Sequence, residues 1–142
     1  MLRVKHLLSM KGKDVWSIGP DQPVLEAVRL MAEKHIGALP VMRDADLVGI
    51  VSERDYARKV ILMGRSSADT PVRDIMTATV KTVSPEEAVH RCMELMTDMR
   101  IRHLPVVDKQ RVVGMVSIGD LVKAVIEEQQ QTITQLERYI AS

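Results

Sequence analysis

The stretch IGALPVMRDADLVGIVSERD, residues 36–55, returns 65 residues later as IRHLPVVDKQRVVGMVSIGD, residues 101–120. Both copies carry an LPV triplet, a glycine inside the second apolar run and a final Ser-x-x-Asp. The same offset continues upstream without a gap, as far as Pro20 in one copy and Pro85 in the other. A repeat of this kind indicates two copies of one structural unit.

Each copy predicts the order strand, helix, strand, strand, helix. Apolar residues recur at helical spacing from Val24 to Met31 and from Val89 to Met96, where Cys92 replaces Ala27 and is expected to be a small core residue. Short Val-rich runs separated by polar turns predict strands. The expected strands cover 38–42, 47–51, 104–107 and 112–116, and the expected second helices cover 53–63 and 118–126.

Other segments lie outside this pattern. Residues 4–8 correspond to residues 72–76 at an offset of 68, so the first copy has three extra residues near 11–13, where a loop is expected. Residues 64–70 form a polar linker. The resulting organisation is 1–66 for the first domain, 67–128 for the second and 129–142 for a C-terminal helical extension.

The extension carries a narrow apolar stripe. Ile126, Ile133 and Ile140 lie seven residues apart, with Leu136 between the last two. This spacing predicts that the last helix continues toward the C-terminus. Because so thin a stripe cannot bury itself, it is expected to pack on the module or on a second copy of the chain.

Composition excludes several classes of function. The net charge is +1, which argues against nonspecific nucleic-acid binding and against a basic membrane patch. No apolar run approaches the roughly 18 residues that a membrane span needs. The first 14 residues are too polar for a secretory signal, and a single cysteine allows no intrachain disulfide, so a cytoplasmic location is expected.

The motifs of common enzymes are absent from the sequence. It has neither of the glycine-rich phosphate loops, GxxxxGK[ST] and GxGxxG, and no HExxH. His6, His35 and His90 lack the spacing of metal ligands and are expected on surfaces or helix faces. We therefore expect a binding module that is not an enzyme and holds no metal.

The doubled unit, with its IxxLPV and GxVSxxD motifs, resembles the CBS domain, named for cystathionine β-synthase. The resemblance covers the chain to about Ile126 and implies an α/β (α+β) fold, with two β-α-β-β-α units packed as a pseudo-twofold pair around two clefts. In many such modules the clefts bind AMP, ADP, ATP, NAD(H) or S-adenosylmethionine. The chain is similar to small stand-alone bacterial CBS pairs. Its stretch 52–67 also resembles plant organellar versions that have been linked to thioredoxin regulation. Family modules commonly dimerise, so a homodimer is expected.

The Ser-x-x-Asp ends, Ser52 to Asp55 and Ser117 to Asp120, lie where a strand is followed by a helix. N–H groups at a helix start favour phosphate. An Asp there can accept both ribose hydroxyls, each bond being worth roughly 1.5–3 kcal/mol. Ser-x-x-acid is also the pattern of a helix capping box, and the two roles can coexist.

The resemblance implies that the Asp of one repeat shares its pocket with the two residues that precede LPV in the other. Asp55 would then share its pocket with Arg102 and His103, while Asp120 would share its pocket with Gly37 and Ala38. Arginine and histidine can neutralise a phosphate, and glycine and alanine cannot. The Asp55 pocket is therefore expected to be the main cleft, the alternative being that Arg102 and His103 form a solvated surface pair.

Adenine is expected against apolar strand residues. The implied main-cleft residues are Ile50, Ser52, Arg54, Asp55, Val80, Lys81, Thr82, Arg102, His103 and Pro105. The implied residues of the second, weaker cleft are Val15, Trp16, Ser17, Gly37, Ala38, Met115, Ser117 and Asp120. Trp16 would stack on a base or serve as a core or dimer contact. A weaker phosphate candidate is Arg65 with Ser66 and Ser67, the alternative being an ordinary linker.

Two hypotheses of function follow. In the first, occupancy by an adenine nucleotide shifts a conformational or dimer equilibrium that an unknown protein partner reads. In the second, the chain is a scaffold whose clefts are vestigial. The apolar stripe and the uncharged second cleft favour the scaffold, and the basic residues of the main cleft favour the sensor.

Overall fold

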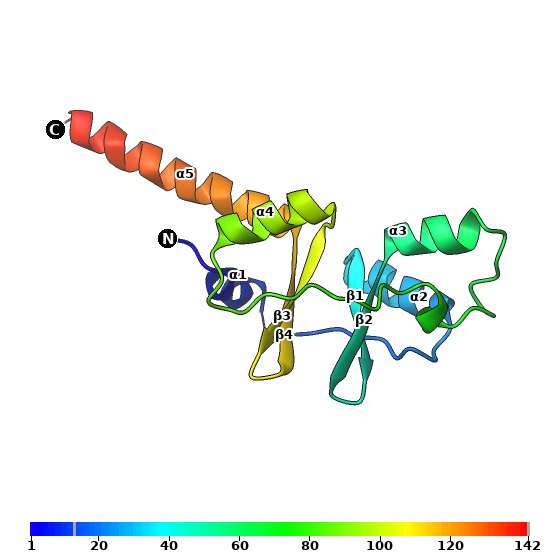
Figure 1. Cartoon of the computed structure of the whole chain (residues 1–142). Helices are drawn as coiled ribbons and strands as arrows, with labels where there is room; N and C mark the ends of the chain where they lie inside the picture. Colours follow the sequence, from blue (N-terminus) through cyan, green and yellow to red (C-terminus); the bar gives the residue numbers. More distant parts are fainter. Residues whose placement is uncertain (13, 142) are drawn as a thin grey trace. The chain divides into compact units, whose positions relative to one another are not determined.

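Each repeat forms one antiparallel pair of strands (Figure 1). In the computed structural model, which describes residues 1–12 and 14–141, β1 (Ala38–Arg43) pairs with β2 (Asp46–Ser52), and β3 (His103–Asp108) pairs with β4 (Arg111–Ser117). The register shifts at the same place in both pairs, after Val41 and after Val106. The repeat of the sequence is therefore matched by a repeat of the strand pairing, including the shift of register.

The helices that precede the strand pairs are those that the apolar spacing predicts. They are α2 (Val24–Lys34) and α4 (Val89–Met99), and each buries the apolar face that the sequence indicates. Both end at a residue in the left-handed conformation, His35 in one and Arg100 in the other. This is a common way to stop a helix, because the N–H of that residue satisfies a carbonyl of the last turn.

The strand expected at the start of each repeat is reduced to a single bridge. Ile18 bridges to Val41 and Val83 bridges to Val106, both in parallel orientation. The next position that would extend each bridge holds a proline, Pro20 or Pro85. Because proline has no N–H to donate, the ladder stops after one residue.

The helix expected over 53–63 has two parts. The first is α3 (Glu53–Tyr56), and the second is a π-helical stretch, Ala57–Ile61. The widened turn lets the N–H of Leu62 donate to the carbonyl of Ala57, five residues back. The spacing of apolar residues does not distinguish such a stretch from an α-helix over so short a length.

The two segments related by the offset of 68 make matching contacts. Val4 begins α1 (Val4–Lys11), and Val72 begins the 3₁₀ helix Val72–Asp74. The N–H of Val4 donates to the carbonyl of Glu87 at 2.9 Å, and the N–H of Val72 donates to the carbonyl of Gln22, also at 2.9 Å. Each segment therefore packs on the copy other than the one that directly follows it in sequence.

Glycines at equivalent positions permit these contacts. A Cβ at Gly49 would lie 2.5 Å from Sδ of Met76, and a Cβ at Gly114 would lie 2.5 Å from Cδ2 of Leu8. The glycine inside each GxVS motif thus leaves room for a segment to lie against the strand.

As a result, the compact units do not coincide with the two sequence repeats. The continuous unit is Val15–Lys81, and the discontinuous unit joins Met1–Asp14 to Thr82–Ser142. The expected boundaries at 1–66 and 67–128 follow the repeat of the sequence, whereas the units group residues by contact. Of the loop expected at 11–13, Lys11 ends α1 and Lys13 lies outside the described residues.

Each unit has its own apolar core. The core of the continuous unit consists of Ile18, Val24, Ala27, Met31, Leu39, Val41, Val51, Val60, Val72 and Ile75. The core of the discontinuous unit consists of Val4, Leu7, Val83, Val89, Cys92, Leu95, Met96, Leu104, Val106, Val116 and Leu121. The core role expected for Cys92 is confirmed, and burial, reinforced by the charge of Glu87, raises the pKa of its thiol to about 11.

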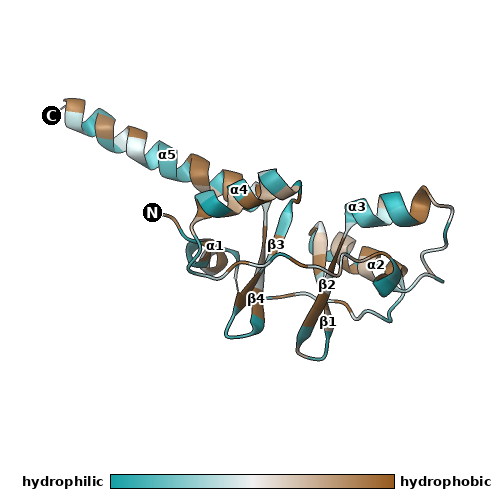
Figure 2. Ribbon diagram, viewed as in Figure 1, coloured by the Kyte–Doolittle hydropathy of each residue, from teal (hydrophilic) through white to brown (hydrophobic). Residues whose placement is uncertain are grey.

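The last helix, α5 (Ile118–Ala141), continues through the expected extension as far as Ala141, the last residue that the structure describes. Figure 2 shows apolar residues recurring along the part of α5 that projects beyond the rest of its unit. The side chains of Ile133, Leu136 and Ile140 are exposed to 48%, 56% and 81%. The stripe therefore does not pack on the chain's own module, which leaves the second copy as the expected partner.

Candidate functional site

The first Ser-x-x-Asp forms the capping box that its spacing predicts. Ser52 is the residue that caps α3, and its hydroxyl accepts a hydrogen bond from the Asp55 N–H at 3.2 Å. In return, Oδ2 of Asp55 accepts from the N–H of Ser52 at 2.9 Å. The capping role is thus present, and it fixes the position of a carboxylate at the junction of β2 and α3.

The other carboxylate oxygen of Asp55 forms an ion pair with Lys59. Oδ1 of Asp55 lies 3.0 Å from Nζ of Lys59, four residues later, and Lys59 also donates to the carbonyl of Ile75 at 2.8 Å. The Asp55 side chain is 15% exposed, so it remains accessible from solvent. Arg54 is exposed beside it.

The second Ser-x-x-Asp repeats the reciprocal bonds with one change. The Ser117 N–H donates to Oδ2 of Asp120 at 2.9 Å, and the Asp120 N–H donates to the Ser117 hydroxyl at 3.1 Å. Here, however, the cation comes from far away in sequence: Nζ of Lys11 lies 2.7 Å from Oδ2 of Asp120 and donates to the carbonyl of Met115 at 2.8 Å.

These contacts set the protonation of Asp120. Burial by itself would raise the pKa of this carboxyl. Hydrogen bonds from Lys11 and Ser117, together with the charge of Lys11, outweigh burial and hold the pKa below its ordinary value of 3.8. Asp120 is therefore a carboxylate that already has a cationic partner.

The residues before each LPV triplet lie next to the Ser-x-x-Asp of their own repeat. Ala38 pairs with Ser52 across the strands, and His103 pairs with Ser117. The carbonyl of Arg102 accepts a hydrogen bond from the Ile118 N–H at 2.9 Å. The chain thus brings Arg102 and His103 beside the second Ser-x-x-Asp within one unit, and the side chain of Arg102 is exposed.

Trp16 is a surface residue with a cation over its ring. Nζ of Lys34 lies 4.1 Å from the ring centroid, a cation–π contact, and the side chain is 38% exposed. The core role considered for Trp16 is therefore wrong. A base stacking on this face of the indole would have to displace Lys34.

The implied cleft residues divide between the two units. The continuous unit holds Val15, Trp16, Ser17, Gly37, Ala38, Ile50, Ser52, Arg54, Asp55, Val80 and Lys81. The discontinuous unit holds Thr82, Arg102, His103, Pro105, Met115, Ser117 and Asp120. Because Asp55 and Arg102 belong to different units, their meeting in one pocket stays a prediction.

The weaker phosphate candidate next to the linker is tied to its own unit. Arg65 forms an ion pair with Asp74 at 2.9 Å, and the carbonyls of Ser66 and Ser67 accept hydrogen bonds from Thr70 and Leu25. These bonds favour the alternative expected for this segment, an ordinary linker that is held in place by contacts within its own unit.

Three lysines at these sites were not predicted from the sequence. Lys59 could have been found, because it lies four residues after Asp55 on a helical segment, the spacing of a side-chain ion pair. Lys34 and Lys11 have no such local signal with respect to their partners. Lys11 is 109 residues from Asp120, so only the folded chain brings them together.

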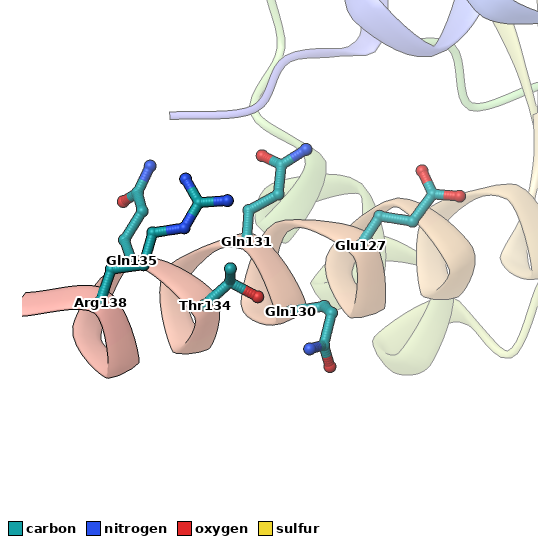
Figure 3. Close-up of a pocket in the computed structure, with 6 residues that line it drawn as sticks. All are labelled: Glu127, Gln130, Gln131, Thr134, Gln135 and Arg138. Carbon is teal, nitrogen blue, oxygen red and sulfur yellow. The ribbon is translucent and has the colours of Figure 1, made fainter. Parts of the chain in front are cut away.

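A shallow hollow on the surface of α5 is unrelated to these residues. Its lining consists of Glu127, Gln130, Gln131, Thr134, Gln135 and Arg138 (Figure 3). All six side chains come from one helix, so no group from a second element converges on the hollow to hold a ligand.

Two further properties concern residues 1–12 and 14–141 only. No helix among them combines the length and the apolar character needed to cross a membrane. No cluster of three or more His, Cys, Asp or Glu side chains there is placed to hold a metal ion.

Comparison with known proteins identifies the repeated unit. A family model described as the CBS domain matches residues 4–61 and matches again at residues 72–127. The chain belongs to the CBS-domain family. The matches cover both sequence repeats, so this is a CBS pair, as the LPV and Ser-x-x-Asp motifs indicated.

Relatives support the same assignment over most of the chain. The mitochondrial CBS domain-containing protein CBSX3 of Arabidopsis thaliana is 44% identical over 147 residues, which cover 96% of this chain and 71% of the relative. A solved structure of a CBS-domain protein from Burkholderia ambifaria is 48% identical, with a TM-score of 0.86, and covers 90% of this chain and 96% of its own. The α/β class, the doubled unit and the long C-terminal helix are thus confirmed.

One solved CBS pair contains ligands. The CBS domain pair of protein MJ0100, in complex with 5-methylthioadenosine and S-adenosyl-L-methionine, is 27% identical to this chain, with a TM-score of 0.80. The alignment covers 90% of this chain and 98% of that one. An adenosyl group is therefore a ligand of at least one CBS pair that shares this fold.

Proposed function

We propose that this CBS pair is a regulatory module that reversibly binds an adenine nucleotide (AMP, ADP, ATP or NAD(H)) and catalyses no reaction. The observation that carries the proposal is the Ser-x-x-Asp box, which in both repeats holds a carboxylate at the start of a helix. A carboxylate in this position can accept the two ribose hydroxyls, while N–H groups of the helix start favour phosphate. The adenosyl ligands of the MJ0100 pair support the same chemistry.

The main site is proposed around Asp55. Arg54, the residue before it, is exposed and can reach a phosphate, whereas the equivalent residue of the second repeat is Gly119. The sequence resemblance adds Arg102 and His103 to this site. Two guanidinium groups and an imidazole would neutralise phosphate charge that a glycine and an alanine leave unpaired.

Calorimetric titration tests the proposal directly. AMP, ATP, NADH and S-adenosylmethionine are titrated into the purified chain, and mass spectrometry of ligand released from gently purified protein identifies what it carries. Saturable heat from an adenine nucleotide is expected. No heat from any of the four would contradict the proposal and favour the scaffold, in which the clefts are vestigial and α5 is the functional surface.

A homodimer through the apolar stripe of α5 is proposed as the means by which the module signals. Ile126, Ile133 and Ile140 repeat every seven residues on an exposed helix face, the period at which two helices pack along a seam.

The cytoplasmic location and the regulated protein partner stay predictions; the plant relative is named as mitochondrial.

Ending the chain after Glu128 is expected to lower the mass of the assembly. The truncation removes Ile133, Leu136 and Ile140, whose burial against a second copy would drive association. Light scattering should show the full chain at a multiple of 15.9 kDa and the truncated chain at its monomer mass.

Point variants separate the stripe from the length of the helix. Ile133→Asp should dissociate the assembly, whereas Gln131→Asp, on the polar side of α5 seen in Figure 3, should not. An unchanged mass for both the truncated chain and Ile133→Asp would place the interface on other helices.

A further inference from the structure

Lys11 occupies polar groups that an adenosyl ligand would need in the second repeat. We call Met115, Ser117 and Asp120 the second half-site; all three belong to the discontinuous unit, as does Lys11. Nζ of Lys11 lies 2.7 Å from Oδ2 of Asp120 and 2.8 Å from the carbonyl oxygen of Met115. One ammonium group thus bridges the helix-start carboxylate and a strand carbonyl.

We propose that Lys11 is a specificity-determining residue that closes the second half-site, so that the chain binds one nucleotide rather than two. The inference rests on the proposed function, because it concerns which of the two repeats accepts the same ligand. Ribose hydroxyls are neutral donors, whereas the ammonium of Lys11 is a charged donor that is already part of the chain. A ligand can occupy Asp120 only by displacing it.

The first repeat also places a lysine next to its Asp, but the lysines of the two repeats differ in their second hydrogen-bond acceptor. Lys59 contacts Oδ1 of Asp55 and also donates to the carbonyl of Ile75. If a ribose takes Asp55, Lys59 keeps this second acceptor, and Ile75 is not one of the residues implied for the main cleft. The second acceptor of Lys11, by contrast, is Met115, which is itself part of the second half-site, so Lys11 stays in that half-site even when it leaves Asp120. The position equivalent to Lys59 in the second repeat holds Ala124, so there the cation comes from α1 instead.

The strand carbonyls of Ile50 and Met115 add to the difference between the two repeats. In the first repeat the carbonyl of Ile50 accepts the N–H of Thr77 at 2.9 Å, a backbone bond that does not involve Lys59. In the second repeat the equivalent carbonyl, that of Met115, accepts Nζ of Lys11. A ligand that displaces Lys11 from both contacts therefore takes away the donor of this carbonyl as well, and the loss of that hydrogen bond opposes binding.

The number of bound nucleotides tests the inference. AMP is titrated by calorimetry into the wild-type chain and into Lys11→Ala, after circular dichroism has shown that the variant is folded. We expect one AMP per wild-type chain and two per Lys11→Ala chain, with second-site affinity raised at least tenfold. The double variant Lys11→Ala/Asp120→Ala should bind one again.

Lys5→Ala is the matched control. Lys5 lies on the same helix, α1, and its ammonium pairs with Glu86 at 3.3 Å rather than with Asp120. This variant should bind one AMP. A second independent measurement is the titration of the Asp120 carboxyl by NMR: its pKa should rise in Lys11→Ala and stay low in Lys5→Ala, because Lys11 donates to this carboxylate and Lys5 does not.

The outcomes distinguish this inference from the proposed function. One AMP bound by wild type and by Lys11→Ala alike would overturn the role of Lys11 and leave the proposed function standing. Two sites of similar affinity in wild type would also overturn it. Binding by Lys11→Ala alone would keep the role of Lys11 and remove the main site from Asp55, and no binding by either protein would overturn both.

Discussion

The Asp55→Ala variant is expected to lose AMP affinity by at least a hundredfold. The substitution removes a carboxylate that would accept two charge-assisted hydrogen bonds from the ribose hydroxyls, each worth roughly 1.5–3 kcal/mol. Every 1.4 kcal/mol is about a factor of ten in the dissociation constant. Calorimetry with AMP measures the loss. The Asp120→Ala variant should keep most of the wild-type affinity, because Lys11 already holds that carboxylate.

Two further variants make this result specific. Asp55→Asn keeps a side-chain oxygen that can accept from the Ser52 N–H, so the start of α3 stays capped while the charge is lost. It should bind nearly as weakly as Asp55→Ala, which separates ligand binding from helix capping. Arg102→Ala should also weaken AMP binding if it shares the site with Asp55. Normal binding by Asp55→Ala together with loss in Asp120→Ala would assign the main site to the second repeat.

The Leu39→Ala variant is expected to lower the free energy of unfolding by about 2–5 kcal/mol. Leu39 is fully buried in β1, and removing its branched side chain leaves a cavity that the strand pair cannot fill. Chemical denaturation followed by circular dichroism gives the value. Leu104, the equivalent residue of β3, is also fully buried, so Leu104→Ala should lower the free energy of unfolding by a similar amount.

Val113→Ala is the control for this prediction. It also lies in a strand, β4, but its side chain is 37% exposed, so the change should stay within about 0.5 kcal/mol. Because each unit has its own core, hydrogen exchange should show the loss of protection in Leu39→Ala mainly within residues 15–81. A change of less than about 1 kcal/mol in Leu39→Ala would contradict the close packing assigned to this residue.

Much of the fold could be predicted because the repeat shows the sequence pattern of each helix and strand twice. The helices beginning at Val24 and Val89, both strand pairs and the continuation of α5 all follow from periodicity and turn residues. The capping boxes at Ser52 and Ser117 also follow from local spacing. These features depend on residues that are close together in sequence.

The features that could not be predicted depend either on contacts between residues far apart in sequence or on the N–H group that a proline lacks. The first strand of each repeat stops at one bridge because Pro20 or Pro85 follows. The contact of Lys11 with Asp120 could not be predicted, because nothing in the local pattern of α1 indicates which repeat it packs on. The assignment of Arg102 to the pocket of Asp55 came from family resemblance and remains to be tested by the variants above.

The placement of α1 in the discontinuous unit has a consequence for the newly made chain. Residues 15–81 leave the ribosome as one stretch, so their unit can form as soon as its last residues have emerged. Val4 and Leu7 are made earlier, yet the core that they enter is completed only by residues after 82. Until then the apolar side chains of α1 have no core to pack into, so we expect α1 to join its unit only after the second repeat has been made.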